Sequence, residues 1–173
     1  MRKVILQLAV SLDGYIEGPK GEFDWCFTDD DYGMSAFFQQ IDAIFIGRKS
    51  YELALSMGGS APLGFPSIKE YVFSNSLKKI EGDRVIVSGN FLAEVNKIKN
   101  LPGKDIWLFG GAELVTFFIN NNLVDEMSLA VHPIVLGAGK PLFQNITERK
   151  KLNLTGIETY PSGLVMISYK LST

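Results

Sequence analysis

Apolar residues follow two different periods along the chain, and the change of period separates strands from helices. Residues 4–10 are apolar on both faces apart from Gln7, which is typical of a central strand covered on both sides. Met34, Phe37 and Ile41 follow the i, i+3, i+7 spacing of an amphipathic helix. We expect strands at 4–10, 43–46, 70–74, 84–87 and 105–109, and helices that begin near residues 34, 47, 91 and 112.

The last third of the chain has the pattern of β-structure. Residues 127–131 alternate apolar with polar or small side chains, and Pro161-Ser162-Gly163 links 152–157 to 164–171 as a hairpin. Strands that alternate with helices require parallel crossovers, whereas a hairpin adds antiparallel strands at an edge. The pattern therefore predicts an α/β fold with three α-β-α layers and a mixed, mostly parallel, twisted sheet that ends in antiparallel C-terminal strands.

Length and composition predict one domain over residues 1–173. The chain is 46% hydrophobic and 21% charged, and at this size a single core can bury roughly 70% of the unfolded surface. No repeat or linker interrupts the pattern. Residues 57–66 are rich in glycine and proline and are expected to form a surface loop within the domain.

Charge and residue counts exclude several classes of function. The 17 basic and 19 acidic residues give a net charge of −2, so no overall field attracts nucleic acid or an anionic membrane. No apolar run reaches the roughly 18 residues of a membrane span. With one cysteine (Cys26) and one histidine (His132), we expect no disulfide framework, no metal site and no Cys/His or Ser/His catalytic pair. These features favour a cytoplasmic protein.

Three turns after predicted strands have the composition of phosphate-binding turns. In open α/β sheets, ligands bind beyond the carboxyl ends of the strands. Turns 46–50 and 109–114 each start a helix directly after a strand, which presents backbone N–H groups to an anion. Each turn alone is also typical of an ordinary connection, but all three are expected at the same end of the sheet. The predicted cofactor contacts are Ile46, Gly47, Arg48, Lys49, Ser50, Ser74, Asn75, Ser76, Phe109, Gly110, Gly111, Ala112, Glu113 and Leu114.

The third turn indicates which dinucleotide binds. Ser74-Asn75-Ser76 offers hydroxyl and amide donors, Lys78 and Lys79 follow closely, and no acidic residue is present to bind a ribose 2′-hydroxyl. These donors suit a 2′-phosphate, so NADPH is expected rather than NADH. Residues 137–142 begin like a dinucleotide-binding fingerprint but lack its third glycine, and we interpret them as a turn after a strand.

Four ordered motifs give the chain a family resemblance. They are residues 11–16 (SLDGYI), 46–52 (IGRKSYE), 109–114 (FGGAEL) and 135–143 (VLGAGKPLF). Together they resemble the reductase domain of the bifunctional riboflavin-biosynthesis deaminase-reductase, in the dihydrofolate-reductase-like superfamily. The resemblance implies that the three turns hold NADPH and that the protein is a homodimer. The zinc deaminase half is missing, so the chain is similar to stand-alone members, for which the family name fixes no substrate.

Candidates for the substrate side are fewer. In dihydrofolate reductase, a carboxylate on the first helix orients the pterin, and Asp31 is the nearest match to it here; its other interpretation is a solvated cap of the helix. Trp25 and Phe37 are candidates for the walls of an aromatic slot, although Phe37 also fits the core. The resemblance places Asp13 near the nicotinamide, whereas its local pattern is that of a hairpin turn. His132 is expected to be a hydrogen-bonded histidine at the end of a strand.

The sequence therefore predicts hydride transfer from NADPH to an electrophilic C=N or C=O carbon of a small heterocyclic or sugar-derived substrate. The nearest named reaction is reduction of 5-amino-6-(5-phosphoribosylamino)uracil in riboflavin biosynthesis. Two alternatives stay open: a pterin or dihydrofolate reductase, and a non-catalytic nucleotide-binding protein. An Asp31 that points into the pocket favours an enzyme.

Overall fold

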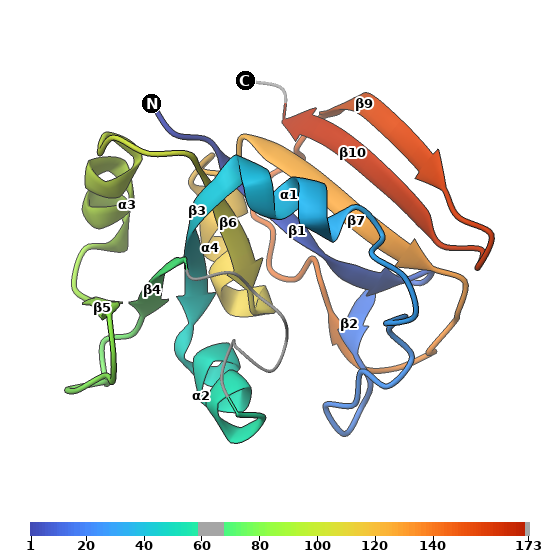
Figure 1. Ribbon diagram of the computed structural model, residues 1–173, viewed down its shortest axis with the longest axis horizontal. Helices are drawn as coiled ribbons and strands as arrows, with labels where there is room; N and C mark the ends of the chain where they lie inside the picture. The colour runs from blue at the N-terminus through green and yellow to red at the C-terminus, as the bar shows by residue number, and fades with distance from the viewer. Residues whose placement is uncertain (59–67, 172–173) are drawn as a thin grey trace.

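The computed structural model describes residues 1–58 and 68–171, which form an eight-stranded sheet with helices on both faces (Figure 1). The strands are β1 (Val4–Ser11), β2 (Tyr15–Glu17), β3 (Ile41–Gly47), β4 (Lys69–Phe73), β5 (Arg84–Val87), β6 (Asp105–Gly110), β7 (Glu126–His132), β8 (Lys140–Pro141), β9 (Leu152–Thr159) and β10 (Val165–Leu171). The helices are α1 (Met34–Gln40), α2 (Arg48–Ser56), α3 (Phe91–Lys99) and α4 (Ala112–Asn120).

The large sheet has the order β5-β4-β3-β6-β1-β7-β10-β9, while β2 and β8 form a second, two-stranded sheet. Strand β1 pairs in parallel with β6 on one side and β7 on the other. Strand β10 is antiparallel to both β7 and β9. The predicted mixed sheet with antiparallel C-terminal strands is therefore confirmed.

Side chains of β3 alternate between two apolar layers, as the period of a strand requires. Phe45 is fully buried and belongs to the largest apolar cluster, which includes residues of α3 and α4. On the opposite face, Ile44 packs in a cluster with Phe37 of α1, and Ile46 packs in a cluster with Tyr51 of α2. Two helices thus cover each face, which gives the predicted three layers (Figure 1).

Strand β9 forms an exposed edge with an apolar face. Leu154 and Ile157 are 55% and 61% exposed, and they lie directly opposite Tyr169 and Ile167 of β10, so all four side chains share one face. In Figure 1, this edge stands apart from the helices. The face continues through β7 into the largest apolar cluster.

Two expectations need a comment. The loop predicted at residues 57–66 lies, from residue 59 on, outside the described residues. The antiparallel pairing of β2 with β8 was missed, because these strands are only three and two residues long and carry no period of their own. Among the described helices, none is long and apolar enough to cross a membrane.

Candidate cofactor and substrate site

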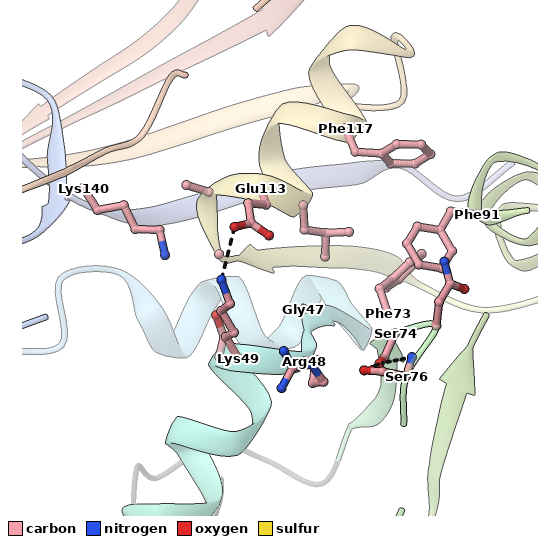
Figure 2. Close-up of a pocket in the computed structure, with 15 residues that line it drawn as sticks. Gly47, Arg48, Lys49, Phe73, Ser74, Ser76, Phe91, Glu113, Phe117 and Lys140 are labelled. Carbon is pink, nitrogen blue, oxygen red and sulfur yellow. Dashed lines mark hydrogen bonds and ion pairs between the residues drawn. The ribbon is translucent and has the colours of Figure 1, made fainter. Parts of the chain in front are cut away.

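The carboxyl ends of β3, β4 and β6 surround a pocket of about 490 Å³, a volume typical of small-molecule sites (Figure 2). All three predicted turns contribute to its wall. Ile46 and Phe109 lie in apolar clusters and Gly110 is buried, so these predicted contacts are not found among the described lining residues. The predicted contacts that do line the pocket are Gly47, Arg48, Lys49, Ser50, Ser74, Asn75, Ser76, Gly111, Ala112, Glu113 and Leu114.

Two helices begin at the pocket without a side-chain cap. Gly47 is the N-cap of α2 and Gly111 the N-cap of α4, and neither can supply a side-chain acceptor. The first backbone N–H groups of both helices can therefore bind an anion. The two turns are in contact, because a Cβ on Gly47 would lie 3.5 Å from the carbonyl oxygen of Gly110. The peptide bond between Gly110 and Gly111 is cis.

Two cationic side chains at the pocket form exposed ion pairs. Arg48 donates from Nη1 to both carboxylate oxygens of Glu52 at 2.9 Å, one helical turn away. Lys49 donates from Nζ to Glu113 Oε1 at 3.2 Å, which links α2 to α4 (Figure 2). Exposed pairs of this kind contribute little free energy, so a bound phosphate can replace the carboxylate as the partner of either cation.

The turn after β4 is held by its own side chains. Ser74 is buried, and its Oγ accepts hydrogen bonds from the backbone N–H of Ser76 at 3.2 Å and of Leu77 at 3.0 Å. Asn75 Oδ1 accepts from the N–H of Gly89 at 2.7 Å. Ser74 therefore fixes the shape of the turn, and its hydroxyl also lies 3.3 Å from that of Ser76. If Ser74 is the donor of this bond, the NH₂ group of Asn75 and the hydroxyl of Ser76 can both donate to a ligand.

The sequence analysis missed four residues of the pocket wall. Phe91 lies with its ring centroid 5.2 Å from that of Phe73 and 5.8 Å from that of Phe117, which makes an aromatic wall near Ser76 (Figure 2). Lys140 reaches the pocket from β8. The helical spacing of Phe91 and Phe117 predicts only an inward-facing side chain, and no local signal separates a pocket wall from the core.

The two aromatic candidates for the substrate side lie in different surroundings. Phe37 is buried and its ring packs edge-to-face on Trp107 with a centroid distance of 5.5 Å, which matches its interpretation as a core residue. Trp25 is half-buried and packs edge-on against His132 at 5.3 Å. Its Nε1–H is buried and has no hydrogen-bond partner among the described residues, and Trp25 is not among the residues that line the pocket.

Asp13 anchors a loop. Its carboxylate accepts from Ser11 Oγ at 2.7 Å and from the backbone N–H groups of Leu136 at 3.1 Å and Gly137 at 2.7 Å. The hydrogen bond from Ser11 is the largest cause that lowers the pKa of this carboxyl, and the two backbone bonds act in the same direction. Asp13 therefore joins the turn after β1 to the segment after β7, and both carboxylate oxygens already have protein donors.

The structure does not bring Asp31 to the pocket that the three turns form. Its side chain is exposed, and Oδ1 accepts from the backbone N–H of Ser35 at 3.0 Å and from its Oγ at 2.6 Å. Ser35 lies in the first turn of α1, so Asp31 satisfies a helix-end donor. This geometry matches the cap interpretation, and the catalytic role of Asp31 stays a prediction.

His132 is fully engaged in hydrogen bonds. Its Nε2 accepts from the backbone N–H of Phe27 at 3.1 Å, and its Nδ1 donates to the carbonyl of Ala130 at 2.9 Å. Burial lowers the pKa of the imidazole, so its neutral form is favoured.

Burial also raises the pKa of Cys26 to about 11, which makes its thiol unreactive. Over residues 1–58 and 68–171, no three His, Cys, Asp or Glu side chains come together to hold a metal ion.

Sequence comparison confirms the resemblance given by the motifs. The profile of the RibD C-terminal domain family matches residues 2–166. The protein YyaP of Bacillus subtilis (strain 168) is 47% identical over 180 aligned positions, which cover 97% of this chain and 94% of YyaP.

Solved structures agree in fold. A protein of Shewanella sp. PV-4 named for riboflavin biosynthesis has a TM-score of 0.85 and 27% identity, with 99% of both chains covered. The deaminase/5-amino-6-(5-phosphoribosylamino)uracil reductase of Thermotoga maritima has a TM-score of 0.76 at 11% identity, and 57% of that longer chain is covered. A dihydrofolate reductase of Enterococcus faecalis in complex with NADP(H) has a TM-score of 0.72 at 11% identity, with 99% of this chain and 97% of that chain covered. The dihydrofolate-reductase-like fold is thereby confirmed.

Proposed function

Because the chain belongs to the RibD C-terminal domain family, a reductase family of the riboflavin-biosynthesis type, we propose that it is an NADPH-dependent reductase of a small heterocyclic or sugar-derived substrate. The observation that carries this proposal is the meeting of two uncapped helix N-termini, Arg48 and Lys49 in one pocket. Backbone N–H groups and cations suit the pyrophosphate of a dinucleotide. The aromatic wall around Phe91 suits an adenine ring.

The preference for NADPH rests on the turn after β4. The NH₂ group of Asn75 and the hydroxyl of Ser76 can donate to a 2′-phosphate, and Arg48 lies between this turn and Lys49 (Figure 2). The turn contains no carboxylate that would accept a hydrogen bond from a ribose 2′-hydroxyl. Phosphate on the 2′-oxygen therefore adds charge-assisted hydrogen bonds that NADH lacks.

The reaction needs little acid-base chemistry from the protein. A bound nicotinamide cofactor supplies the hydride, and the side chains of the site hold the reacting carbon and exclude competing water. The proton of the reduction comes from water or from Asp31, and the surface position of Asp31 favours water.

For the substrate, we propose a pyrimidine that carries a ribosyl group, the class named for the Thermotoga maritima reductase. Asp13 is a positioning residue in this proposal, because both of its carboxylate oxygens bind the protein itself. A pterin would need a buried carboxylate beside its ring, and Asp31 does not meet this need because it is exposed. The pyrimidine is therefore favoured over the pterin.

One observation favours a second function, that of a non-catalytic nucleotide-binding protein. The pocket keeps its phosphate-binding turns, while Asp31 is turned to the surface and His132 is neutral and fully hydrogen-bonded. A protein with this arrangement could bind NADPH without transferring its hydride. The two functions differ in turnover and not in cofactor affinity.

The deciding experiment measures binding and turnover separately. Titration calorimetry with NADPH and NADH gives the affinities, and the loss of NADPH absorbance is followed with pyrimidine, pterin and carbonyl substrates. Preferential NADPH binding together with turnover of a ribosylaminopyrimidine is the expected result. Tight NADPH binding without turnover of any substrate would support the sensor, and equal affinities for the two cofactors would contradict the 2′-phosphate argument.

Two properties outside the pocket complete the proposal. We propose a homodimer that forms through the apolar face of β7, β10 and β9, where Leu154 and Ile157 are exposed beside Ile167 and Tyr169. The charged residues of β9 and β10, Glu158 and Lys170, occupy the alternate register positions and lie on the opposite face. We also propose a cytoplasmic location, because a lone protonated thiol fits a reducing compartment.

A further inference from the structure

The motif at residues 135–143 lies outside the three cofactor turns, yet one of its residues reaches the same pocket. Its residue Lys140 lines the pocket beside Lys49 and Glu113. In Figure 2, Lys140 and Ser76 lie at opposite ends of the pocket, with Lys49 and Arg48 between them. A cation from a segment far from β3, β4 and β6 in sequence therefore faces the ends of these strands.

Several contacts hold the segment that carries Lys140. Asp13 accepts the N–H groups of Leu136 and Gly137 at 3.1 and 2.7 Å. Leu142 is fully buried, and its N–H donates to the carbonyl of Gly14 at 2.9 Å. The backbone of Lys140 pairs with β2. The segment is thus fixed at both ends to the turn that follows β1.

The glycine before Lys140 fits this close attachment. A Cβ on Gly139 would lie only 2.1 Å from the carbonyl oxygen of Glu17, and its φ of +144° is rare for a residue with a side chain. No other residue type permits the same approach to β2. The backbone of Lys140 is therefore fixed in position, while its long side chain can still change rotamer.

The ion pair between Lys140 and Glu17 is weak enough for a ligand to replace Glu17. Nζ lies 3.5 Å from Glu17 Oε1, and the two side chains are 31% and 29% exposed. Such a pair contributes little, whereas an ammonium group that donates to a phosphate oxygen forms one of the stronger hydrogen bonds in proteins. The geometry points to Lys140 as a third phosphate-binding cation of the cofactor site, with Asp13 as the positioning residue that holds its segment. This inference rests on the proposed function.

Its place in the pocket identifies the phosphate that Lys140 meets. The donors for the 2′-phosphate lie at the Ser76 end, whereas Lys140 lies at the end formed by Lys49 and the start of α4 (Figure 2). Lys140 therefore contacts the pyrophosphate, which NADPH and NADH share. Loss of the Lys140 cation should weaken the binding of NADPH and of NADH by the same factor. Loss of a donor to the 2′-phosphate should weaken the binding of NADPH alone.

The test measures the dissociation constants of both cofactors for Lys140→Gln, Lys140→Arg and the control Lys97→Gln. Lys97 is an exposed, ion-paired lysine of α3 that is not among the lining residues. Lys140→Gln should raise both constants roughly tenfold, the scale of one charge-assisted hydrogen bond. Lys140→Arg should restore most of the affinity, and Lys97→Gln should change neither constant.

A double-mutant cycle tests the role of Asp13. Asp13→Asn should lower the affinity for NADPH several-fold in the wild-type background. It should cause no further loss in the Lys140→Gln variant, because Asp13 acts through the side chain of Lys140. An additive effect would overturn the positioning role. Unchanged NADPH affinity in a folded Lys140→Gln, or a loss confined to NADPH and absent for NADH, would overturn the assignment of Lys140. A wild-type chain that binds no NADPH would overturn the proposed function as well, so the two failures are distinguishable.

Discussion

At the scale of the residue, the pocket depends on places where a side chain is missing. Gly111 has an ordinary φ of −75°, so its backbone does not require glycine, but a Cβ there would lie 3.1 Å from Ser50 Oγ. Space, and not backbone strain, is therefore the constraint. An alanine can be accommodated if the Ser50 hydroxyl rotates away, whereas a branched side chain occupies the space where the pyrophosphate is proposed to bind.

We expect Gly111→Val to lose cofactor binding, with a dissociation constant raised by about 100-fold or more. Its circular dichroism spectrum and thermal midpoint should remain close to those of the wild type. Gly111→Ala should have an intermediate affinity. A folded Gly111→Val with normal NADPH affinity would show that the turn is only a structural connection.

Ser76 offers a test of cofactor choice. Ser76→Asp places a carboxylate where the 2′-phosphate is proposed to lie, so two anions repel each other, while a ribose 2′-hydroxyl can donate to the new acceptor. We expect the ratio of NADPH affinity to NADH affinity to fall at least tenfold. Ser88→Asp, in the connection after β5, adds the same charge at a residue that is not among the described lining. A ratio that falls equally in both variants would reflect the added charge alone.

The sequence predicted this site unevenly, for a physical reason. Gly47, Arg48, Asn75 and Gly111 could be predicted because each lies at the end of a strand or within two residues after it, so local order alone places them at one edge of the sheet. Lys140 could not, because only the pairing of β2 with β8 and the hydrogen bonds of Asp13 bring it there. Contacts between distant segments leave no local period or spacing.

At the scale of the element, His132 connects two parts of the chain that share no strand pairing. It ends β7 and accepts the N–H of Phe27, in the segment between β2 and α1 that also carries Trp25. Only the neutral imidazole can accept that hydrogen bond through Nε2 while Nδ1 donates to Ala130. Protonation removes this acceptor and leaves the N–H of Phe27 without its partner.

The stability of this attachment should therefore depend on pH. Burial lowers the pKa of His132 in the folded chain below the ordinary value of about 6.5, so the unfolded chain binds the proton more readily. The stabilisation is complete above that value and is lost as the pH falls from there toward the folded pKa. Thermal midpoints measured between pH 7 and 5 should drop by a few degrees more in the wild type than in His132→Asn. Parallel pH profiles would contradict this role.

The elements themselves were predicted well wherever burial is two-sided. Strands β1, β3 and β6 are covered on both faces, so their sequences are apolar on both faces apart from single polar residues such as Gln7 and Asp42. β8 could not be predicted, since two residues held by their neighbours have no pattern of their own. α1 was predicted from its inward face, and Phe37 at its centre is a core residue, whereas Ile41, which the helical spacing had included, begins β3.

At the scale of the whole molecule, the exposed face of β9 predicts self-association. Ile157→Lys places a charge within the proposed apolar contact and should raise the dimer dissociation constant by about 100-fold or more, because the charge loses its hydration on burial. Sedimentation equilibrium measures this change. Val85→Lys is the matched control, since Val85 is 37% exposed on β5 at the opposite edge of the sheet. A wild type that is monomeric at all concentrations, or an Ile157→Lys variant that is as dimeric as the wild type, would contradict the proposed interface.

The position of β1 has a consequence for synthesis of the chain. β1 leaves the ribosome well before its two sheet partners, residues 105–110 and 126–132. Until β7 has left the ribosome, the two hydrogen-bonding edges of the apolar strand β1 cannot both be paired. Unpaired strand edges are prone to aggregate with other chains. The sheet therefore cannot close around β1 until residue 132 has been synthesised, and β1 is open to contact with other chains until then.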